Sequence, residues 1–136
     1  LDPHIPRQDV REKKGVVVIG TVQGDIHEIG KRIVGTMLEV YGFEVHDLGC
    51  DVTIETFIEK AKELKADILA TSALMTTTMI YMPELIKQLG ERGIRDQFKV
   101  MVGGAPVVRS WAKEIGSDGY GRTTSEAIAE ADRLVE

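Results

Sequence analysis

Short apolar runs alternate with longer amphipathic segments along most of the chain. Residues 16–19 form a fully apolar, β-branched run, which is typical of a strand buried in a parallel sheet. Apolar side chains then recur at helical spacing from Ile29 to Tyr41, and Gly42 follows where glycine commonly ends a helix. The alternation predicts strands over residues 16–19, 43–48, 68–70 (ending at Thr71-Ser72), 100–102 and 119–120, and helices over residues 29–41, 53–64, 79–92, 110–115 and 125–135.

Five strands that alternate with five helices predict an α/β fold with helices on both faces of an open parallel sheet. At this length we expect a doubly wound, flavodoxin-like (Rossmann-like) sheet with its five strands in the order 2-1-3-4-5. Residues 1–14 carry two of the four prolines and seven charges without helical or strand periodicity. We therefore expect a tail or linker over residues 1–14 and one domain over residues 15–136.

Composition limits the partners of such a domain. Its 136 residues suit one hydrophobic core, and the net charge of −5 argues against a general nucleic-acid binder. The single cysteine, Cys50, excludes an internal disulfide and a Cys-only metal cage, and it fits a reducing cytoplasm. No apolar run approaches the length of a membrane span. We therefore expect a cytoplasmic protein with neither nucleic-acid nor membrane partners.

The glycine-rich and polar loops of the chain gather at one edge of the predicted sheet. Ligands of such sheets bind beyond the carboxyl ends of the strands, where the first and third strands diverge. Glycine-rich or polar loops follow three strands there, at residues 20–30, 72–78 and 103–104. We predict the ligand site at this edge.

Known phosphate sites do not match these loops. A P-loop places four residues before its Gly-Lys pair and then Ser or Thr, whereas five residues separate Gly24 from Gly30 and Arg32 follows Lys31. The dinucleotide fingerprint G-x-G-x-x-G is absent as well. A phospho-receiver domain would need acidic residues at the ends of the first and third strands, which end here in Gly-Thr and Thr-Ser.

Asp25 and His27 form the remaining chemical pattern. A neutral imidazole is a common metal ligand, and a carboxylate often orients its second nitrogen. An ordinary surface-loop histidine is the alternative interpretation. Because the chain has three histidines, with His4 in the tail and His46 in a predicted strand, it shows no protein-only zinc site. If His27 binds a metal, a cofactor must supply the other ligands.

The sequence GDIHEIGK at residues 24–31 resembles the D-x-H-x-x-G signature of cobalamin-binding domains. Ser72-Ala73-Leu74 is similar to the S-x-L element of that family, and Gly103-Gly104 to its G-G element. Residues 118–120 resemble the family's final strand, so the resemblance covers residues 15–135. It implies cobalamin bound base-off and histidine-on, with His27 as the lower axial cobalt ligand.

The resemblance also implies roles for other residues. Asp25 would bind the second imidazole nitrogen, and the hydroxyl of Thr78 would complete this relay. Ser72 and Leu74 would line the slot for the nucleotide tail. The glycines Gly30, Gly103 and Gly104 would let backbone approach the cofactor, and Thr76, with Met75 and Val22, would face the corrin ring.

Details of the loops favour the methyltransferase corrinoid proteins, which include the cobalamin module of methionine synthase and the methanol and methylamine carriers. This resemblance implies a non-catalytic methyl carrier that cycles between Co(I) and methyl-Co(III). Its partners would be a methyl-donor-specific methyltransferase, a methyl-acceptor methyltransferase and a reductive activator. Such carriers usually begin with a four-helix cap over the corrin, which is not found in these 136 residues.

Three other interpretations stay open at this point. The first is the cobalamin module of an acyl-CoA mutase, whose loops typically read D-G-H-D-R-G and S-S-L-A. The second is a cobalamin-dependent sensor, and the third is a flavodoxin-like domain with a vestigial site.

Overall fold

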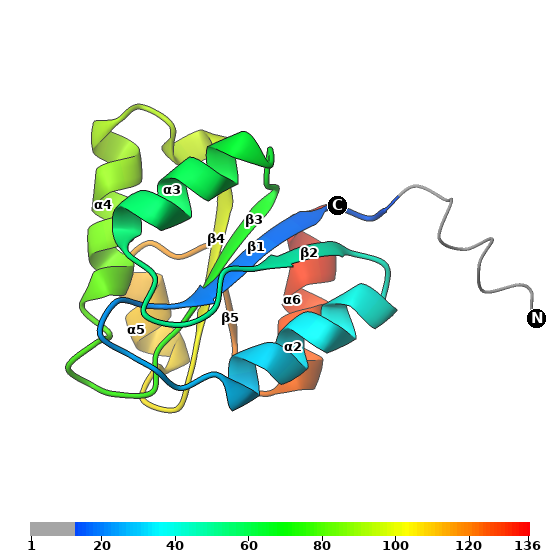
Figure 1. The fold of residues 1–136 in the computed structure, drawn as a ribbon, viewed down its shortest axis with the longest axis horizontal. Helices are drawn as coiled ribbons and strands as arrows, with labels where there is room; N and C mark the ends of the chain where they lie inside the picture. Colours follow the sequence, from blue (N-terminus) through cyan, green and yellow to red (C-terminus); the bar gives the residue numbers. More distant parts are fainter. Residues whose placement is uncertain (1–12) are drawn as a thin grey trace, which may run out of the picture.

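A computed structural model describes residues 13–136. A five-stranded parallel sheet lies at its centre, with the strand order β2-β1-β3-β4-β5 (Figure 1). The strands are β1 (Val16–Thr21), β2 (Glu44–Asp47), β3 (Ile68–Ser72), β4 (Lys99–Gly103) and β5 (Gly119–Gly121). The predicted fold class and strand order are confirmed.

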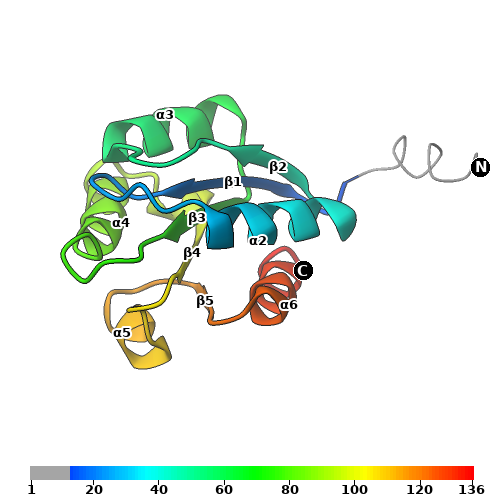
Figure 2. The ribbon, with the colours of Figure 1, turned by 60° about the horizontal axis from the view of Figure 1, so that its bottom comes forward.

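The helices form a layer on each face of the sheet. They are α2 (Ile29–Val40), α3 (Ile54–Glu63), α4 (Tyr81–Glu91), α5 (Arg109–Glu114) and α6 (Thr124–Leu134), and a short 3₁₀ helix, Arg95–Gln97, precedes β4. Helices α2 and α6 lie side by side on one face, and α3, α4 and α5 cover the other (Figure 2). The 3₁₀ helix was not predicted, because its three residues carry no periodic apolar pattern.

Two hydrophobic clusters follow from the alternation of side chains along the strands. In β1, Val17 and Ile19 pack under α2 and α6, whereas Val18 packs under the opposite helix layer. Residues of β3 and β4 alternate in the same way, so each face of the sheet is buried. This two-sided burial explains why the strands read as continuous apolar runs.

Local contacts define the ends of two helices, and one of them is at Gly42, as the sequence predicts. The Thr53 side chain accepts a hydrogen bond from the Thr56 amide and caps α3. Gly42, which ends the α2 turn, adopts φ +103°, a conformation that favours glycine.

Helix α2 differs from its sequence pattern. Leu38 is fully buried, but Ile29 is 79% exposed and Ile33 is 50% exposed. The helix therefore carries apolar side chains that no other described element covers. Helical spacing alone does not tell which of two apolar faces enters a core.

The predicted tail falls almost wholly on residues 1–12, which lie outside the described residues, as does His4. Lys14 is bound to the domain, since its amide donates to the Gly42 carbonyl and its ammonium pairs with Asp132, each at 2.9 Å. None of the helices within residues 13–136 combines the length and apolar character that a membrane crossing demands.

Candidate functional site

The carboxyl ends of four strands form a row across the sheet. Thr21 of β1 is in register with Ser72 of β3, Ser72 with Gly103 of β4, and Gly103 with Gly121 of β5. The loops that follow these residues therefore start next to one another. This register brings together the residues around 25, 74 and 104 that the sequence pattern singled out.

Asp25 is the most highly bonded side chain at this edge. It is 0% exposed. Its Oδ1 accepts hydrogen bonds from the His27 ring nitrogen Nδ1 at 2.8 Å and from the His27 amide at 3.2 Å. Its Oδ2 accepts from the Leu74 amide at 2.7 Å and from the Thr78 hydroxyl at 2.8 Å. Each carboxylate oxygen is thus satisfied twice, which compensates the burial of its charge.

The surroundings of Asp25 keep it ionised. Burial by itself raises the pKa of a carboxyl group, but the hydrogen bonds from Leu74, His27 and Thr78 stabilise the charged form. Together they lower the pKa of Asp25 from 3.8 to about 2. At neutral pH the carboxylate is an acceptor only, so the hydrogen between it and the imidazole lies on Nδ1 of His27.

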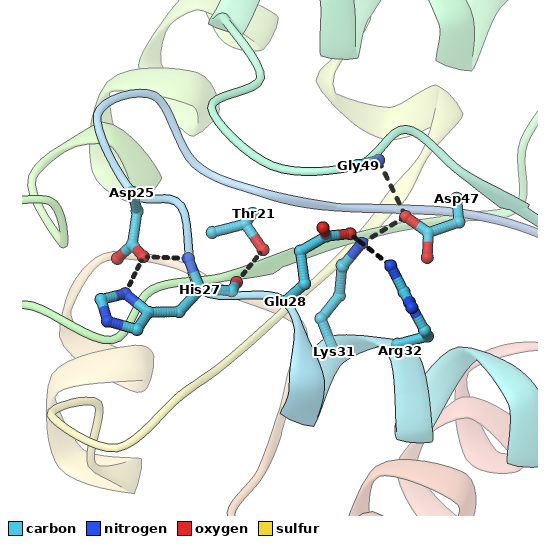
Figure 3. Close-up of polar contacts among 8 residues, drawn as sticks. All are labelled: Thr21, Asp25, His27, Glu28, Lys31, Arg32, Asp47 and Gly49. Carbon is cyan, nitrogen blue, oxygen red and sulfur yellow. Dashed lines mark hydrogen bonds and ion pairs between the residues drawn. The ribbon is translucent and has the colours of Figure 1, made fainter.

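His27 lies in the loop before α2, beside Asp25 (Figure 3). Its carbonyl oxygen accepts a hydrogen bond from the buried Thr21 hydroxyl at 2.8 Å, which fixes the loop to the end of β1. The imidazole is 48% exposed. Because Nδ1 is engaged by Asp25, Nε2 presents its lone pair as the ring nitrogen that can bind a metal.

Thr78 connects this loop to the one after β3. The residue is 5% exposed, and its hydroxyl lies 2.8 Å from Asp25 Oδ2 and 3.0 Å from the Met75 carbonyl oxygen. A hydroxyl has one hydrogen to donate. The carboxylate of Asp25 is charged, so it is a stronger acceptor than the Met75 carbonyl oxygen. The Thr78 hydroxyl therefore supports the ionised form of Asp25.

Asp51, in the loop after β2, forms hydrogen bonds that hold the Asp25 loop in place. Its amide donates to the Asp25 carbonyl at 2.9 Å, and its side chain accepts from the Gly24 amide at 2.8 Å. Asp51 adopts φ 55°, a conformation that aspartate tolerates better than most residues. Neither Asp51 nor Thr21 could be singled out from the sequence, because their contacts involve main-chain atoms that no side-chain motif indicates.

Lys31 anchors the first turn of α2. Its side chain is 0% exposed, and its ammonium pairs with Asp47 at the end of β2 and lies 3.4 Å from Glu28 (Figure 3). Glu28 also pairs with the exposed Arg32 at 3.2 Å. This network joins the start of α2 to the edge strand, directly after His27. The position of Lys31 directly after Gly30 in the sequence motif is the signal that could have identified this residue.

A cavity of about 380 Å³ opens at this edge, between the sheet and helices α2 and α6. Small side chains create it, since Ala70, Ser72, Gly103 and Gly121 occupy strand positions and Ala127 the facing helix. Its volume is within the range of about 300–1,000 Å³ that is usual for small-molecule pockets. Its lining comprises Ile19, His27, Gly30, Lys31, Val34, Ala70, Thr71, Ser72, Leu74, Met101, Val102, Gly103, Gly104, Ala105, Gly121, Arg122, Thr123, Thr124 and Ala127.

The predicted glycines line the cavity for different reasons. Gly104 has φ +119°, and a side chain there would overlap the Ala73 carbonyl oxygen, so the fold itself requires glycine. A Cβ on Gly103 would lie 3.1 Å from the Gly121 carbonyl oxygen. A Cβ on Gly30 would meet nothing within 4 Å. The fold does not explain Gly30, whereas an occupant of the cavity would.

The structure brings together most of the predicted site residues. His27, Gly30, Ser72, Leu74, Gly103 and Gly104 line the cavity, and Asp25 and Thr78 lie beneath His27. Thr76 is exposed in the loop after β3 and does not line the cavity. Val22 corrects one expectation: it is 1% exposed within the core under α3 and α4, so it cannot face a ring at the surface.

Within residues 13–136, no three His, Cys, Asp or Glu side chains are grouped closely enough to hold a metal ion. His27 is therefore suited to a metal that brings its other ligands with it. The apolar floor of the cavity, which includes Ile19, Val34 and Met101, is suited to a flat apolar ring. Both features fit a corrinoid, whose cobalt is already held by ring nitrogens and whose tail ends in a benzimidazole base.

A sequence model of the B12 binding domain matches residues 15–129, which is most of the chain. The chain belongs to the B12 binding domain family. Its cofactor is cobalamin, and the features of the site described above agree with that cofactor.

Individual members of the family resemble this chain closely. Dimethylamine corrinoid protein 2 of Methanosarcina acetivorans is 53% identical over 135 residues, covering 99% of this chain and 62% of the relative. The monomethylamine corrinoid protein of Methanosarcina barkeri superposes with a TM-score of 0.86 at 39% identity, covering 95% of this chain and 62% of that one. The methanol:cobalamin methyltransferase complex MtaBC from the same organism gives a TM-score of 0.84 at 35% identity, covering 91% and 47%.

The chain thus spans under two thirds of these B12-binding relatives. Residues 15–129, which the B12 binding model matches, contain the whole sheet and every residue of the candidate site. The rest of each relative lies beyond the region that these comparisons align.

Proposed function

We propose that this domain is the corrinoid-binding part of a methyl carrier. In this proposal His27 Nε2 would bind the cobalt, and the tail base would occupy the cavity between the sheet and α2 and α6. Two matched relatives are named as methylamine corrinoid proteins, and a third belongs to a methanol:cobalamin methyltransferase complex. Their names favour a methyl carrier over a mutase module or a sensor.

The contact between Asp25 and His27 carries the proposal. The 2.8 Å bond from Nδ1 to Oδ1 selects the tautomer in which Nε2 is free to coordinate. The carboxylate also holds the ring in one orientation, because it accepts from both Nδ1 and the main-chain amide of His27. A histidine in an unrelated surface loop would need neither this carboxylate nor its burial.

Thr78 and the Leu74 amide hold the far oxygen of Asp25. They keep the carboxylate in place whether or not His27 is bound to a metal. The bound corrinoid supplies a cobalt centre that accepts and releases a methyl group. We propose that Asp25 and Thr78 hold the His27 ring in the same orientation throughout the carrier cycle.

Apolar side chains at the carboxyl edge provide a surface around His27. Ile26 in the same loop is 73% exposed, and Leu74, Ile80 and Val108 in or beside the neighbouring loops are exposed as well. Exposed apolar residues that gather at one edge mark a binding surface. We propose that they contact the corrin ring and the partners that load and unload it: a methyl-donor-specific methyltransferase, a methyl-acceptor methyltransferase and a reductive activator.

A methyl-transfer assay tests the carrier role. The protein is loaded with cobalamin, reduced, and mixed with mono-, di- or trimethylamine and the corresponding methyltransferase. We expect one donor pair to methylate the bound cofactor, which the visible spectrum reports, and His27→Ala to slow the transfer. If the corrinoid stays bound through His27 but accepts a methyl group from no methylamine or methanol system, the domain is a sensor or mutase module and the carrier proposal is wrong.

A further inference from the structure

The cavity changes from apolar to polar toward its mouth. Its floor is formed by Ile19, Ala70 and Met101, which belong to the buried cluster under α2 and α6. Its exposed side at the start of α6 is formed by Arg122 and Thr123. An elongated ligand with an apolar base would place its more polar portion toward these residues.

Two residues with cationic side chains, Lys31 and Arg122, line the cavity, and they differ in whether an acidic partner already compensates their charge. Lys31 is compensated by Asp47 and Glu28, so it carries no spare positive charge. The guanidinium of Arg122 takes part in none of the ion pairs found within residues 13–136. Arg122 is thus the lining residue whose positive charge is free to bind an anion.

The main chain at Arg122 is held in place. A side chain at Gly121 would overlap Ala127, so the turn from β5 into α6 is tight. The Arg122 amide donates to Glu126 Oε1 at 2.9 Å. The same oxygen lies 3.7 Å from the Arg109 guanidinium. Glu126 therefore binds the Arg122 main chain and pairs with the Arg109 side chain, and it forms no ion pair with the Arg122 side chain.

We infer that Arg122 binds the phosphodiester of the nucleotide tail when the tail base occupies the cavity. The inference rests on the proposed function and adds a residue that selects corrinoids with a complete tail. The phosphodiester joins the base and its sugar to the rest of the cofactor and carries one negative charge. A guanidinium can offer two parallel N–H groups to such a phosphate. Although the chain carries a net charge of −5, the unpaired Arg122 provides positive charge at this cavity.

The test compares cobalamin with cobinamide, which lacks the nucleotide and its phosphodiester. Dissociation constants are measured for the wild type, Arg122→Gln and the matched control Lys113→Gln. Lys113 is exposed on α5, outside this cavity, and its substitution changes the net charge by the same amount. We expect Arg122→Gln to weaken cobalamin binding about three- to tenfold, the range for a partly exposed charged contact, with cobinamide unaffected. Lys113→Gln should leave both constants unchanged.

Ionic strength gives a second measurement on the same proteins. Added salt should weaken cobalamin binding more in the wild type than in Arg122→Gln, because the variant lacks the screened contact. Equal cobalamin affinity in the wild type and Arg122→Gln would overturn the inference. An equal loss for cobalamin and cobinamide would overturn it too, since Arg122 would then act on the ring or the fold.

Failure of the proposed function looks different. If the wild type binds neither corrinoid, or binds both equally, the domain has no tail site and the proposed function fails together with the inference. If the wild type binds cobalamin more tightly than cobinamide and Arg122→Gln does so to the same degree, the proposed tail site is supported. Only the role of Arg122 in binding the phosphodiester is then wrong.

Discussion

The Thr78 hydroxyl lies 2.8 Å from Asp25 Oδ2, although 53 residues separate the two in the sequence. The contact joins the loop after β1 to the loop after β3. Both residues are buried, so the hydrogen bond is shielded from water. It makes the position of the His27 ring depend on two strands of the sheet rather than on one flexible loop.

Replacing Thr78 with valine should therefore destabilise the domain. The variant keeps the shape of the side chain but leaves Asp25 Oδ2 with one hydrogen bond fewer, at a cost of about 1–3 kcal/mol. Thr78→Ser, which keeps the hydroxyl, should lose much less, and Thr77→Val at the exposed neighbouring position should change little. Urea denaturation measures all three. Equal stability of Thr78→Val and Thr77→Val would show that the contact contributes nothing.

Asp25→Asn should change how stability depends on pH. The pKa of Asp25 is lowered from 3.8 to about 2, so the ionised group stabilises the fold above its unfolded pKa. That stabilisation is lost as the pH falls from about 3.8 to about 2 and amounts to about 2 kcal/mol. The wild type should exceed the variant in stability most strongly above about pH 5, and the gap should narrow by this amount in acid. A gap that is constant with pH would contradict the assignment.

Gly30→Ala should separate folding from binding. The new methyl group meets no protein atom within 4 Å, and alanine favours a helix over glycine by about 1 kcal/mol, so stability should be kept or raised. Corrinoid binding should weaken, because the methyl group enters the cavity. Gly90→Ala in α4 is the matched control, since its methyl group is also uncontacted but far from the cavity. If both variants bind corrinoid like the wild type, no ligand approaches Gly30.

Lys31→Met should lower the free energy of unfolding by about 1–3 kcal/mol, because it removes the cation that pairs with Asp47 and leaves Glu28 with the exposed Arg32 alone. Arg32→Met removes an exposed partner of the same Glu28 and should cost less than about 1 kcal/mol. Thermal denaturation of the two variants checks the difference. Similar losses for both would mean that the burial of Lys31 does not matter.

Much of the architecture was predictable from local patterns. Apolar β-branched runs such as residues 16–19 indicate buried parallel strands, and the carboxyl ends of such strands meet at one edge. That reasoning places the loops around Asp25, Ser72 and Gly103 together. The side-chain partners Asp25, His27 and Thr78 followed from a motif, and the structure brings all three into contact.

The remaining features depend on contacts that local patterns do not encode. The Leu74 amide and Asp51 hold Asp25 through main-chain atoms, and any residue type supplies an amide. Gly104 looked like a residue for ligand approach, but its conformation and the nearby Ala73 carbonyl explain it within the fold. Helical spacing groups Ile29 with the other apolar residues of α2, but the structure leaves Ile29 exposed, because periodicity identifies apolar faces and not their partners.

Coordination of cobalt by His27 is the central claim, and a visible spectrum tests it most directly. Methylcobalamin or hydroxocobalamin is added to the wild type, His27→Ala and the control His46→Ala, whose histidine lies on the edge strand β2 and pairs with Glu44. The wild type and His46→Ala should show cofactor with its tail base displaced and a histidine ligand, and His27→Ala should lack the histidine signature. A spectrum that is the same for the wild type and His27→Ala, or the same as that of the free cofactor, would contradict the account.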